Sequence, residues 1–384
     1  MAGRIAVAIA DNIVSPLGFT TLENYAAVKA GRTGLKRYSH QWGLPEPFMA
    51  ALINREAVEA ECEQEGINDS LTFFEKMAVL SIQKALNQCN VDVTSDRTLI
   101  ILSTTKGNVE LLEGAEKRIM LGEAAKAIAD YLSNPNQPLV VSNACISGAC
   151  AQIEAQRLLK AGMYDDVIVC GADVQSPFIV SGFQSLKALT DTPCRPFDED
   201  RTGINLGDAA ATIIYKGIDS EACGLKGEEC GWCLVKGAIR NDAFHISSPS
   251  NTGEGCYRTL RQVLEGVDLE EIAFVNAHGT ATLFNDEMES VAIDRAGLSA
   301  VPVNSLKGYF GHTMGAGGVL ESIISMQALD EGVILSTKGF ENLGVSRKIN
   351  VAAQNGSTHK KTFVKMMSGF GGCNAAILFI RGEW

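Results

Sequence analysis

The chain has 384 residues, which is enough for one large domain or two of ordinary size. Apolar residues make up 46% and charged residues 20%, as in a folded globular protein, and no apolar run reaches the roughly 18–20 residues of a membrane span. The formal net charge of −12 disfavours nucleic acid as the main partner. We therefore expect a globular protein that binds neither nucleic acid nor a membrane.

The first residues predict a strand rather than an export signal. The apolar stretch after Arg4 ends at Asp11, which is too short for a signal-peptide core, and its alternating pattern is typical of a strand. The eleven cysteines lack the spacing of a small disulfide scaffold, so most are expected to be reduced thiols used as small apolar residues. Together these features predict a cytoplasmic protein.

Helix-like and strand-like segments then alternate along the chain. Amphipathic helix patterns at 73–89 and 257–264 each precede an apolar run. Runs typical of buried strands lie at 98–102, 138–141, 167–170, 272–275, 300–303 and 333–335. Strands that alternate with helices predict βαβ units around a mainly parallel sheet.

A faint internal repeat indicates that this α/β chain is duplicated. Cys145 and His312 are each followed by Gly-Ala three and four residues later, by an aliphatic residue at the eighth position and by Glu at the ninth. In the second copy that glutamate is Glu321. We predict two similar halves, residues 1–222 with the cysteine and residues 223–384 with the histidine.

The repeat places Cys145 and His312 at equivalent positions, each at the start of a helix just beyond a strand. Free backbone N–H groups and the helix dipole favour negative charge there, and this setting lowers the pKa of a thiol. His278 also follows a buried strand, between Ala and Gly. These residues are candidates for nucleophilic chemistry, although a buried apolar cysteine and two core histidines would explain the same pattern.

Four segments carry a resemblance to a known family. They read NACISGAC at 143–150, AHGTATLFNDEMES at 277–290, NSLKGYFGHTMGAGGVLE at 304–321 and SGFGGCNAAILF at 368–379. In order and spacing they resemble the signature segments of β-ketoacyl synthases of the elongating Cys-His-His type, within the thiolase-like superfamily. RPFDEDRTGINLGDAAA at 195–211 resembles a further family segment. The resemblance spans nearly the whole chain.

The resemblance implies a fold and a reaction. The fold would be a five-layer αβαβα arrangement with two mixed sheets. The reaction would be a decarboxylating Claisen condensation, in which an acyl thioester joins malonyl-acyl carrier protein to give a 3-oxoacyl-acyl carrier protein, in fatty acid or polyketide-like biosynthesis. This acyltransferase would bind no cofactor or metal, would take substrates on the phosphopantetheine of acyl carrier protein, and would form a homodimer.

The resemblance also implies catalytic roles. Cys145 would hold the acyl group as a thioester. His278 and His312 would stabilise the enolate that forms when the malonyl unit loses carbon dioxide. Lys307, paired with Glu321, would set the charge and proton balance around the histidines. Two imidazole donors facing a developing enolate would each contribute about 2.7–4 kcal/mol, by analogy with oxyanion holes.

Other positions would hold the substrate. The backbone N–H groups of Cys145 and Phe370 would form the oxyanion hole, and Phe370 resembles the gating aromatic of the family. Thr280 and Thr282 would hydrogen-bond the phosphopantetheine arm, and Gly371 would join them in substrate binding.

Three positions depart from the family pattern without removing a catalytic group. Asn205 stands where an apolar residue is usual, Ala209 replaces a glycine, and Cys373 replaces a threonine. Each is expected near the site, where it would alter the shape of the pocket.

Three other functions stay open. A thiolase acting on coenzyme A thioesters would need a second cysteine before the C-terminal glycines, whereas Cys373 follows them. A silent partner that shapes chain length in a heterodimer typically lacks the nucleophile that Cys145 supplies. A metal or redox module on Cys230 and Cys233 has no convincing fourth ligand. Neither the acyl chain length nor the pathway follows from the sequence.

Overall fold

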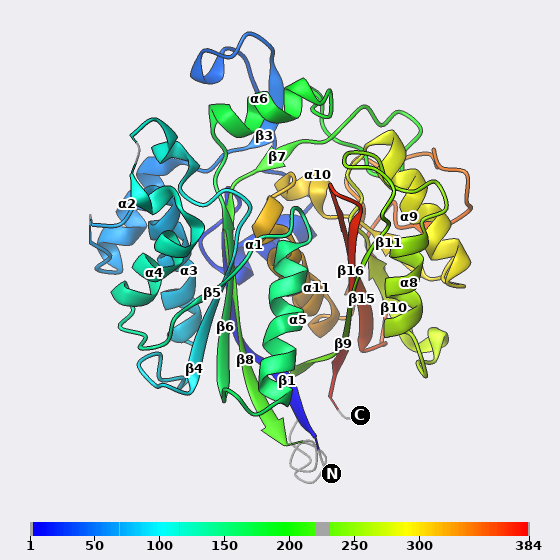
Figure 1. Cartoon of the computed structure of the whole chain (residues 1–384). Coiled ribbons are helices and arrows are strands. Elements are labelled where there is room, and N and C mark those ends of the chain that lie inside the picture. Colours follow the sequence, from blue (N-terminus) through cyan, green and yellow to red (C-terminus); the bar gives the residue numbers. More distant parts are fainter. Residues whose placement is uncertain (1–2, 69, 115, 220–230, 383–384) are drawn as a thin grey trace.

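The computed structural model describes residues 3–68, 70–114, 116–219 and 231–382 (Figure 1). The first half contains β1 (Arg4–Val14), α1 (Thr21–Lys29), β2 (Lys36–Tyr38), β3 (Phe48–Ala51), α2 (Arg55–Gln64), α3 (Phe73–Leu86), β4 (Thr98–Ser103), α4 (Leu121–Tyr131), β5 (Leu139–Val141), α5 (Ser147–Lys160), β6 (Asp166–Asp173), α6 (Pro177–Ser185), β7 (Leu206–Gly207) and β8 (Ala209–Asp219). The second half contains β9 (Trp232–Asn241), α8 (Glu254–Val263), β10 (Ile272–Asn276), α9 (Leu283–Arg295), β11 (Pro302–Asn304), α10 (Lys307–Phe310), α11 (Gly317–Asp330), β12 (Val333–Ile334), β13 (Asn350–Val351), β14 (Gly356–Ser357), β15 (Thr362–Gly369) and β16 (Cys373–Arg381).

The sheet topology shows the duplication that the repeat predicts. In the first half the strands lie side by side in the order β5-β4-β6-β8-β1, and in the second half β11-β10-β15-β16-β9 repeat that order, with β13 added at the edge. Strands β4 and β10 pair in parallel with both of their neighbours, and the next strand pairs toward the middle of the sheet are antiparallel. Each half of the sheet is therefore mixed. Antiparallel pairing of β1 with β9 joins them into one eleven-stranded sheet.

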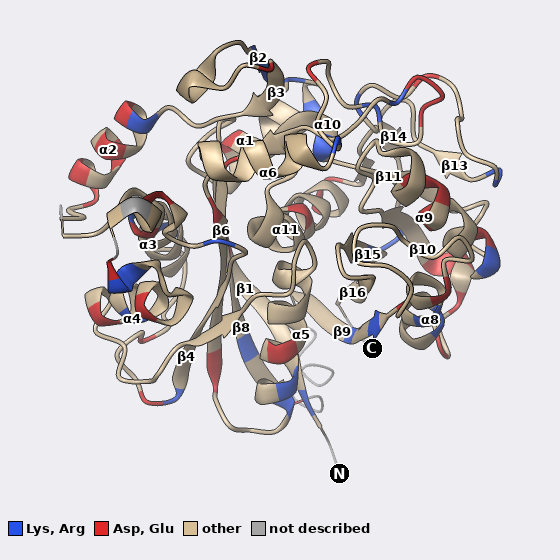
Figure 2. Cartoon of the chain, turned by 45° about the horizontal axis from the view of Figure 1, so that its top comes forward, with Lys and Arg blue, Asp and Glu red and all other residues tan. Residues whose placement is uncertain are grey.

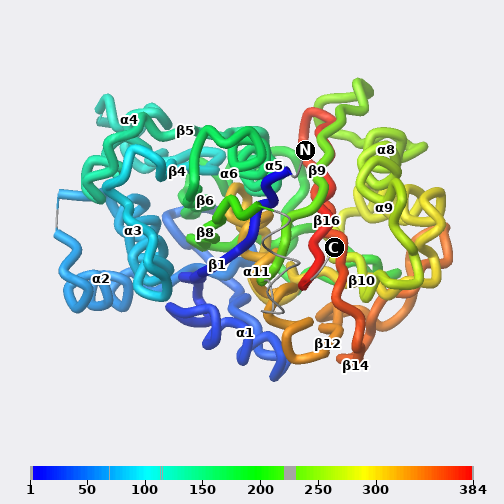
Figure 3. Tube along the Cα trace, turned by 90° about the horizontal axis from the view of Figure 1, so that it is seen from below, coloured from blue at the N-terminus to red at the C-terminus, as the bar shows by residue number. Residues whose placement is uncertain are grey.

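The helices complete a five-layer αβαβα arrangement. Helices α3 and α4 cover the outer face of the first half-sheet, α8 and α9 cover the outer face of the second, and α5 and α11 lie between the two (Figures 1 and 3). The predicted fold class is therefore confirmed, with its two mixed sheets joined edge to edge.

Charged residues follow this layering. Most lie on the outer helices, while the middle of the molecule carries few (Figure 2). Among the described residues no helix is long and apolar enough to cross a membrane.

The apolar run at 333–335, which the sequence predicts as a buried strand like that at 167–170, does not join the large sheet. Its first two residues form β12, which pairs only with β14, outside the large sheet. The position equivalent to β6 is taken by β15, whose side chains are buried along nearly its whole length. Solvent reaches Val333, so the short run lacks the two-sided burial of a central strand.

The central helices α5 and α11 approach each other closely because glycines face the contact. A Cβ on Gly148 would lie 2.8 Å from the carbonyl oxygen of Gly315, and one on Gly318 would lie 2.5 Å from the backbone nitrogen of Ala149. Real Cβ atoms do not approach backbone so closely, and the glycines of the repeat therefore permit this packing. It brings the starts of the two repeat helices side by side.

Candidate active site

Cys145 lies on a strained turn between β5 and α5. Ala144 before it has a φ of 46°, a backbone conformation uncommon for a residue with a side chain. Ser147 fixes the turn, because its hydroxyl donates to the carbonyl of Ala144 at 2.6 Å and accepts from the N–H of Asn143 at 2.8 Å. The turn holds Cys145 two residues before Ser147, the first residue of α5, and only 9% of Cys145 is exposed.

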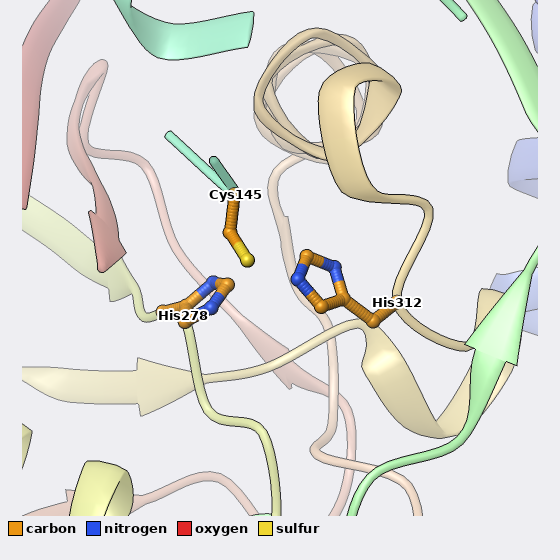
Figure 4. A group of neighbouring side chains, drawn as sticks. All are labelled: Cys145, His278 and His312. Carbon is orange, nitrogen blue, oxygen red and sulfur yellow. The ribbon is translucent and has the colours of Figure 1, made fainter. Parts of the chain in front are cut away.

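His278 and His312 come from the second half and face this thiol. His278 follows β10, and His312 follows α10 and precedes α11. The sulfur of Cys145 and one nitrogen of each imidazole all lie within 4.8 Å of one another (Figure 4). The two ring centroids are 5.0 Å apart with the planes at 81°. The structure thus brings the three predicted residues together.

Hydrogen bonds define the tautomer and position of His312. Its Nδ1 accepts the backbone N–H of Met314 at 3.2 Å, so in the neutral ring the proton resides on Nε2. Nε2 is buried and has no hydrogen-bond partner among the described residues. The backbone N–H of His312 donates to the carbonyl of Asn205 at 2.7 Å. His312 therefore offers one free N–H donor to a bound substrate.

Glu289 holds the loop that carries His278. One oxygen of its carboxylate accepts the backbone N–H of His278 and the other accepts that of Gly279, each at 2.7 Å. The Nδ1 atom of His278 is buried without a hydrogen-bond partner in the described residues. A substrate carbonyl can occupy the space that both imidazoles face.

A buried ion cluster lies nearby. Glu321 contacts Lys307 through Oε1 at 2.7 Å, which is the predicted pair, and Lys365 through Oε2 at 2.6 Å. At most 3% of any of these three side chains is exposed. Lys365 was not predicted, although one lysine within the apolar run of a buried strand is a signal that could have revealed it.

The electrostatic state of the site is dominated by burial. Burial raises the pKa of the Cys145 thiol to about 12, so the expectation of a pKa lowered by the helix N-terminus is wrong for the resting protein. The Phe370 backbone N–H and Lys307 oppose that rise without overcoming it. Burial also holds the pKa of His278 and His312 well below the ordinary value, and Lys307 and Lys365 add to the effect. The resting site holds a neutral thiol and two neutral imidazoles.

The three residues open into a cavity of about 340 Å³. Its walls include Cys145, Phe183, Leu186, Ile204, Ile246, His278, Thr280, Thr282, Leu283, His312 and Phe370. The predicted threonines share a hydrogen bond of 2.8 Å between their hydroxyls. Gly371 is exposed, has a φ of 84°, and lies on the adjoining turn rather than among the described lining residues.

Phe370 lies at the mouth of this cavity. Its side chain is 38% exposed, and its ring packs against Phe183 with 5.9 Å between centroids. Its backbone N–H hydrogen-bonds the sulfur of Cys145. The ring and the N–H are thus placed as a gate and an oxyanion donor would require.

Two of the three positions that depart from the family pattern, Asn205 and Cys373, contact residues of the site. Asn205 is buried, accepts the N–H of Cys194 at 2.7 Å and, through its carbonyl, holds His312. Ala209 is buried at the start of β8. The thiol of Cys373 donates to the carbonyl of Phe370 at 3.2 Å. The main chain at Asn205 thus helps to hold His312, while the asparagine side chain ties together its own loop.

Cysteine and histidine ligands at this spacing also fit a zinc ion by number and type. The positive charges of Lys307 and Lys365, which help to lower the pKa values of both histidines, also disfavour a divalent cation here. Of the Cys230–Cys233 pair, Cys233 is buried in β9, and Cys230 lies outside the described residues together with the predicted boundary at 222/223. The absence of a metal or cofactor stays a prediction.

A buried thiol, two imidazoles and a backbone N–H directed at the sulfur are groups that thioester acyl transfer can use. The family model "Beta-ketoacyl synthase, N-terminal domain" matches residues 54–218, and "Beta-ketoacyl synthase, C-terminal domain" matches residues 233–341. The chain belongs to the β-ketoacyl synthase family. The predicted family and enzyme class, an acyltransferase that forms carbon–carbon bonds, are confirmed.

Two relatives show the extent of the similarity. A 3-oxoacyl-[acyl-carrier-protein] synthase 2 of Rhizobium meliloti (strain 1021) is 32% identical over 279 residues, which cover 68% of this chain and 65% of the relative. An enzyme of the same name from Vibrio cholerae serotype O1 is 28% identical over 99% of this chain and 100% of its own length. The match thus covers just under two thirds of the first relative and the whole of the second.

Solved structures support the fold. A β-ketoacyl synthase from Burkholderia phymatum STM815 superimposes with a TM-score of 0.86 at 24% identity, over 99% of this chain and 100% of that chain. The ishigamide ketosynthase/chain length factor gives 0.85 at 24% identity, over the whole of both chains.

Proposed function

We propose that this protein catalyses the decarboxylating condensation of an acyl thioester on Cys145 with malonyl-acyl carrier protein, giving a 3-oxoacyl-acyl carrier protein. The observation that supports it most directly is the thiol and two imidazole nitrogens lying within 4.8 Å of one another, beside a cavity of about 340 Å³. The 3-oxoacyl-[acyl-carrier-protein] synthase names of the relatives agree with this reaction.

The first step is an exchange of thioesters. The sulfur of Cys145 attacks the acyl carbonyl, whose oxygen is met by the backbone N–H groups of Cys145 and Phe370. The bond to the carrier sulfur breaks, and the carrier thiolate takes up the proton that Cys145 releases. One thioester and one thiol give another pair of the same kind, so the step is nearly balanced in energy.

The second step forms the carbon–carbon bond. The malonyl carboxylate leaves as carbon dioxide, and its electron pair forms an enolate whose oxygen accepts hydrogen bonds from His278 and His312. The enolate carbon attacks the Cys145 thioester, the carbon–sulfur bond breaks, and the Cys145 thiolate takes a proton from water. Loss of carbon dioxide supplies the carbanion, so no strong base is needed.

The proposed substrate contacts follow the same site. The hydroxyls of Thr280 and Thr282 lie in the cavity wall, where an entering phosphopantetheine arm can hydrogen-bond them. Gly371 would act through its backbone on the adjoining turn. Acyl carrier protein is the partner that this substrate requires, and no further bound cofactor is proposed. A cytoplasmic location stays a prediction.

Intact-protein mass spectrometry tests the nucleophile. After incubation with an acyl-acyl carrier protein, we expect one added acyl mass on the protein and none on Cys145→Ala. Cys150→Ala is the matched control, because Cys150 is a buried thiol on the helix that follows Cys145. Equal labelling of Cys145→Ala and the unmodified protein would overturn the proposal.

A partner that shapes chain length in a heterodimer is the second candidate. One finding favours it: a ketosynthase in complex with its chain length factor from Xenorhabdus doucetiae is a structural neighbour of this chain. The thiol and both imidazoles nevertheless support an active condensing subunit. A thiolase using coenzyme A thioesters is disfavoured, because Cys373 points to the Phe370 carbonyl rather than into a second acyl site.

A further inference from the structure

Lys365 is a lysine in the middle of β15 that solvent does not reach. Lysine is among the residues least often fully buried, because removing an ammonium group from water is costly unless it is paired. Its Nζ contacts Glu321 at 2.6 Å and donates to the Met366 carbonyl at 2.8 Å. Burial lowers the pKa of Lys365 to about 8 although Glu321 opposes that fall, so the ammonium is held in place and stays mostly protonated at neutral pH.

This ammonium also contacts the strand that leads to a catalytic histidine. Its Nζ donates to the carbonyls of Asn276 and Ala277, at 3.4 and 3.5 Å. Ala277 directly precedes His278. Lys365 thus joins Glu321 on α11 to the end of β10, which carries the His278 loop.

The carboxylate of Glu321 faces two lysine ammonium groups, those of Lys307 and Lys365. The charged and titratable groups around Lys365 are Glu321 on α11, Lys307 on α10, Glu289 on α9 and the two imidazoles. Lys307 alone would neutralise Glu321, so Lys365 adds one uncompensated positive charge to that pair. Glu289 is a separate carboxyl, bonded to the backbone of the His278 loop.

We propose that Lys365 is a positioning residue for the condensation, which acts through this charged cluster to keep His278 and His312 neutral so that each presents an N–H to the enolate. The inference rests on the proposed function of the site and extends it to a residue outside the cavity wall. A protonated imidazole would also donate, but it would then carry a buried charge that the lysines oppose.

The direction of the pKa shifts agrees with this role. Lys365 and Lys307 both hold the pKa of His278 and of His312 down, in addition to burial. Removal of the Lys365 charge raises the pKa values of His278 and His312 toward the ordinary value for histidine. As the pH falls, both imidazoles therefore become protonated at a higher pH than in the unmodified protein. A nearby unit charge at an effective dielectric constant near 20 shifts a pKa by about one unit.

The test compares Lys365→Met with Lys361→Met, which removes an exposed lysine just before the same strand. Isotope-labelled histidine in the full chain lets NMR follow the imidazole titrations, with His278→Ala and His312→Ala used for assignment. We expect the His278 and His312 midpoints to rise by about one pH unit in Lys365→Met and to stay unchanged in Lys361→Met. The acidic limb of malonyl decarboxylation should move upward by the same amount.

Other outcomes distinguish an effect of the Lys365 charge on the imidazoles from a purely structural role of Lys365. If Lys365 only fills space, Lys365→Met will melt earlier but keep the imidazole midpoints, which overturns the inference. Lys365→Arg keeps the charge and should restore the midpoints of the unmodified protein. If Lys365→Met does not fold, Lys365→Gln carries the same expectation. Because the imidazole titrations need no substrate, they can support the inference even if the condensation itself is not observed.

Discussion

The thiol of Cys145 is protonated in the resting protein, because burial raises its pKa to about 12. A nucleophile of this kind loses its proton only as a substrate arrives. The cost of the buried charge is then met by the oxyanion donors and by transfer of the proton to the departing carrier sulfur. The site is therefore protected from unwanted electrophiles between turnovers.

Alkylation of Cys145 measures this protection. The thiolate fraction, and hence the rate with iodoacetamide, should rise about tenfold per pH unit from about pH 7 to about pH 10 without a plateau. Peptide mass spectrometry of the modified residue gives the rate, and the unfolded protein is the control, since free thiols have a pKa near 8.5. A plateau below about pH 8 would show a lowered pKa instead.

His312 should matter more for decarboxylation than for acylation. His312→Ala removes the free Nε2–H, and loss of one such donor costs about 10²–10³-fold in rate. Release of carbon dioxide from malonyl-acyl carrier protein should fall by that factor, while acyl transfer to Cys145 continues at a reduced level. His359→Ala changes an exposed histidine and is the control. Unchanged release of carbon dioxide would contradict the assigned role.

The residue motifs predicted most of the site, and the exceptions have a physical reason. Cys145, His278 and His312 stand out because each lies beside glycine near the end of a strand or the start of a helix, whereas Lys307 and Glu321 were paired through the family resemblance. Lys365 has no such pattern. Its role depends on a contact with Glu321, forty-four positions earlier in the chain, and sequence periodicity alone cannot show which strand residue will meet which helix.

At the scale of elements, the decisive feature is the crossing of α5 and α11. Their shared Gly-Ala positions allow backbone to contact backbone, and this brings a cysteine from one half to a histidine from the other. The carboxylate of Asp173 at the end of β6 reinforces the contact, because it accepts the N–H of Gly315 at 2.7 Å. The duplication was predictable from the repeat, but this geometry was not.

Adding one methyl group at the crossing tests its importance. Gly318→Ala places a Cβ 2.5 Å from the backbone nitrogen of Ala149, so the helices must separate. We expect a loss of roughly 1–3 kcal/mol in the free energy of unfolding and a fall in condensation rate. Gly122→Ala in α4 is the control, since its Cβ would meet nothing within 4 Å.

For a similar reason, the sequence could not show that the apolar run at 333–335 lies outside the large sheet. A run of three apolar residues indicates burial but not the sheet that will accept it. Here the preceding helix α11 ends at Asp330, and the short segment pairs with β14 before β15 enters the large sheet. The equivalent strand could be recognised only from the pairing itself.

At the scale of the whole molecule, the large sheet has an apolar edge. Strand β5 ends the sheet, Leu139 is 38% exposed, and Val140 and Val141 are partly exposed. An unpaired apolar edge is a template for another strand. We propose that two copies pair through β5 about a twofold axis, which is the homodimer that the resemblance implies.

Leu139→Lys should separate these copies. Light scattering during size-exclusion chromatography should give one chain mass for this variant and twice that mass for the unmodified protein. Leu112→Lys, which changes another exposed leucine, is the control and should leave the mass unchanged. A single chain mass for the unmodified protein would contradict the dimer.

The pairing of β1 with both β8 and β9 has a consequence for synthesis on the ribosome. Strand β1 has no sheet neighbour until β8, which begins at Ala209, has been made. During that interval both of its edges expose unpaired backbone groups that can capture other nascent chains. The polypeptide must therefore be shielded cotranslationally, or translated quickly through this interval, to reach its native state in good yield.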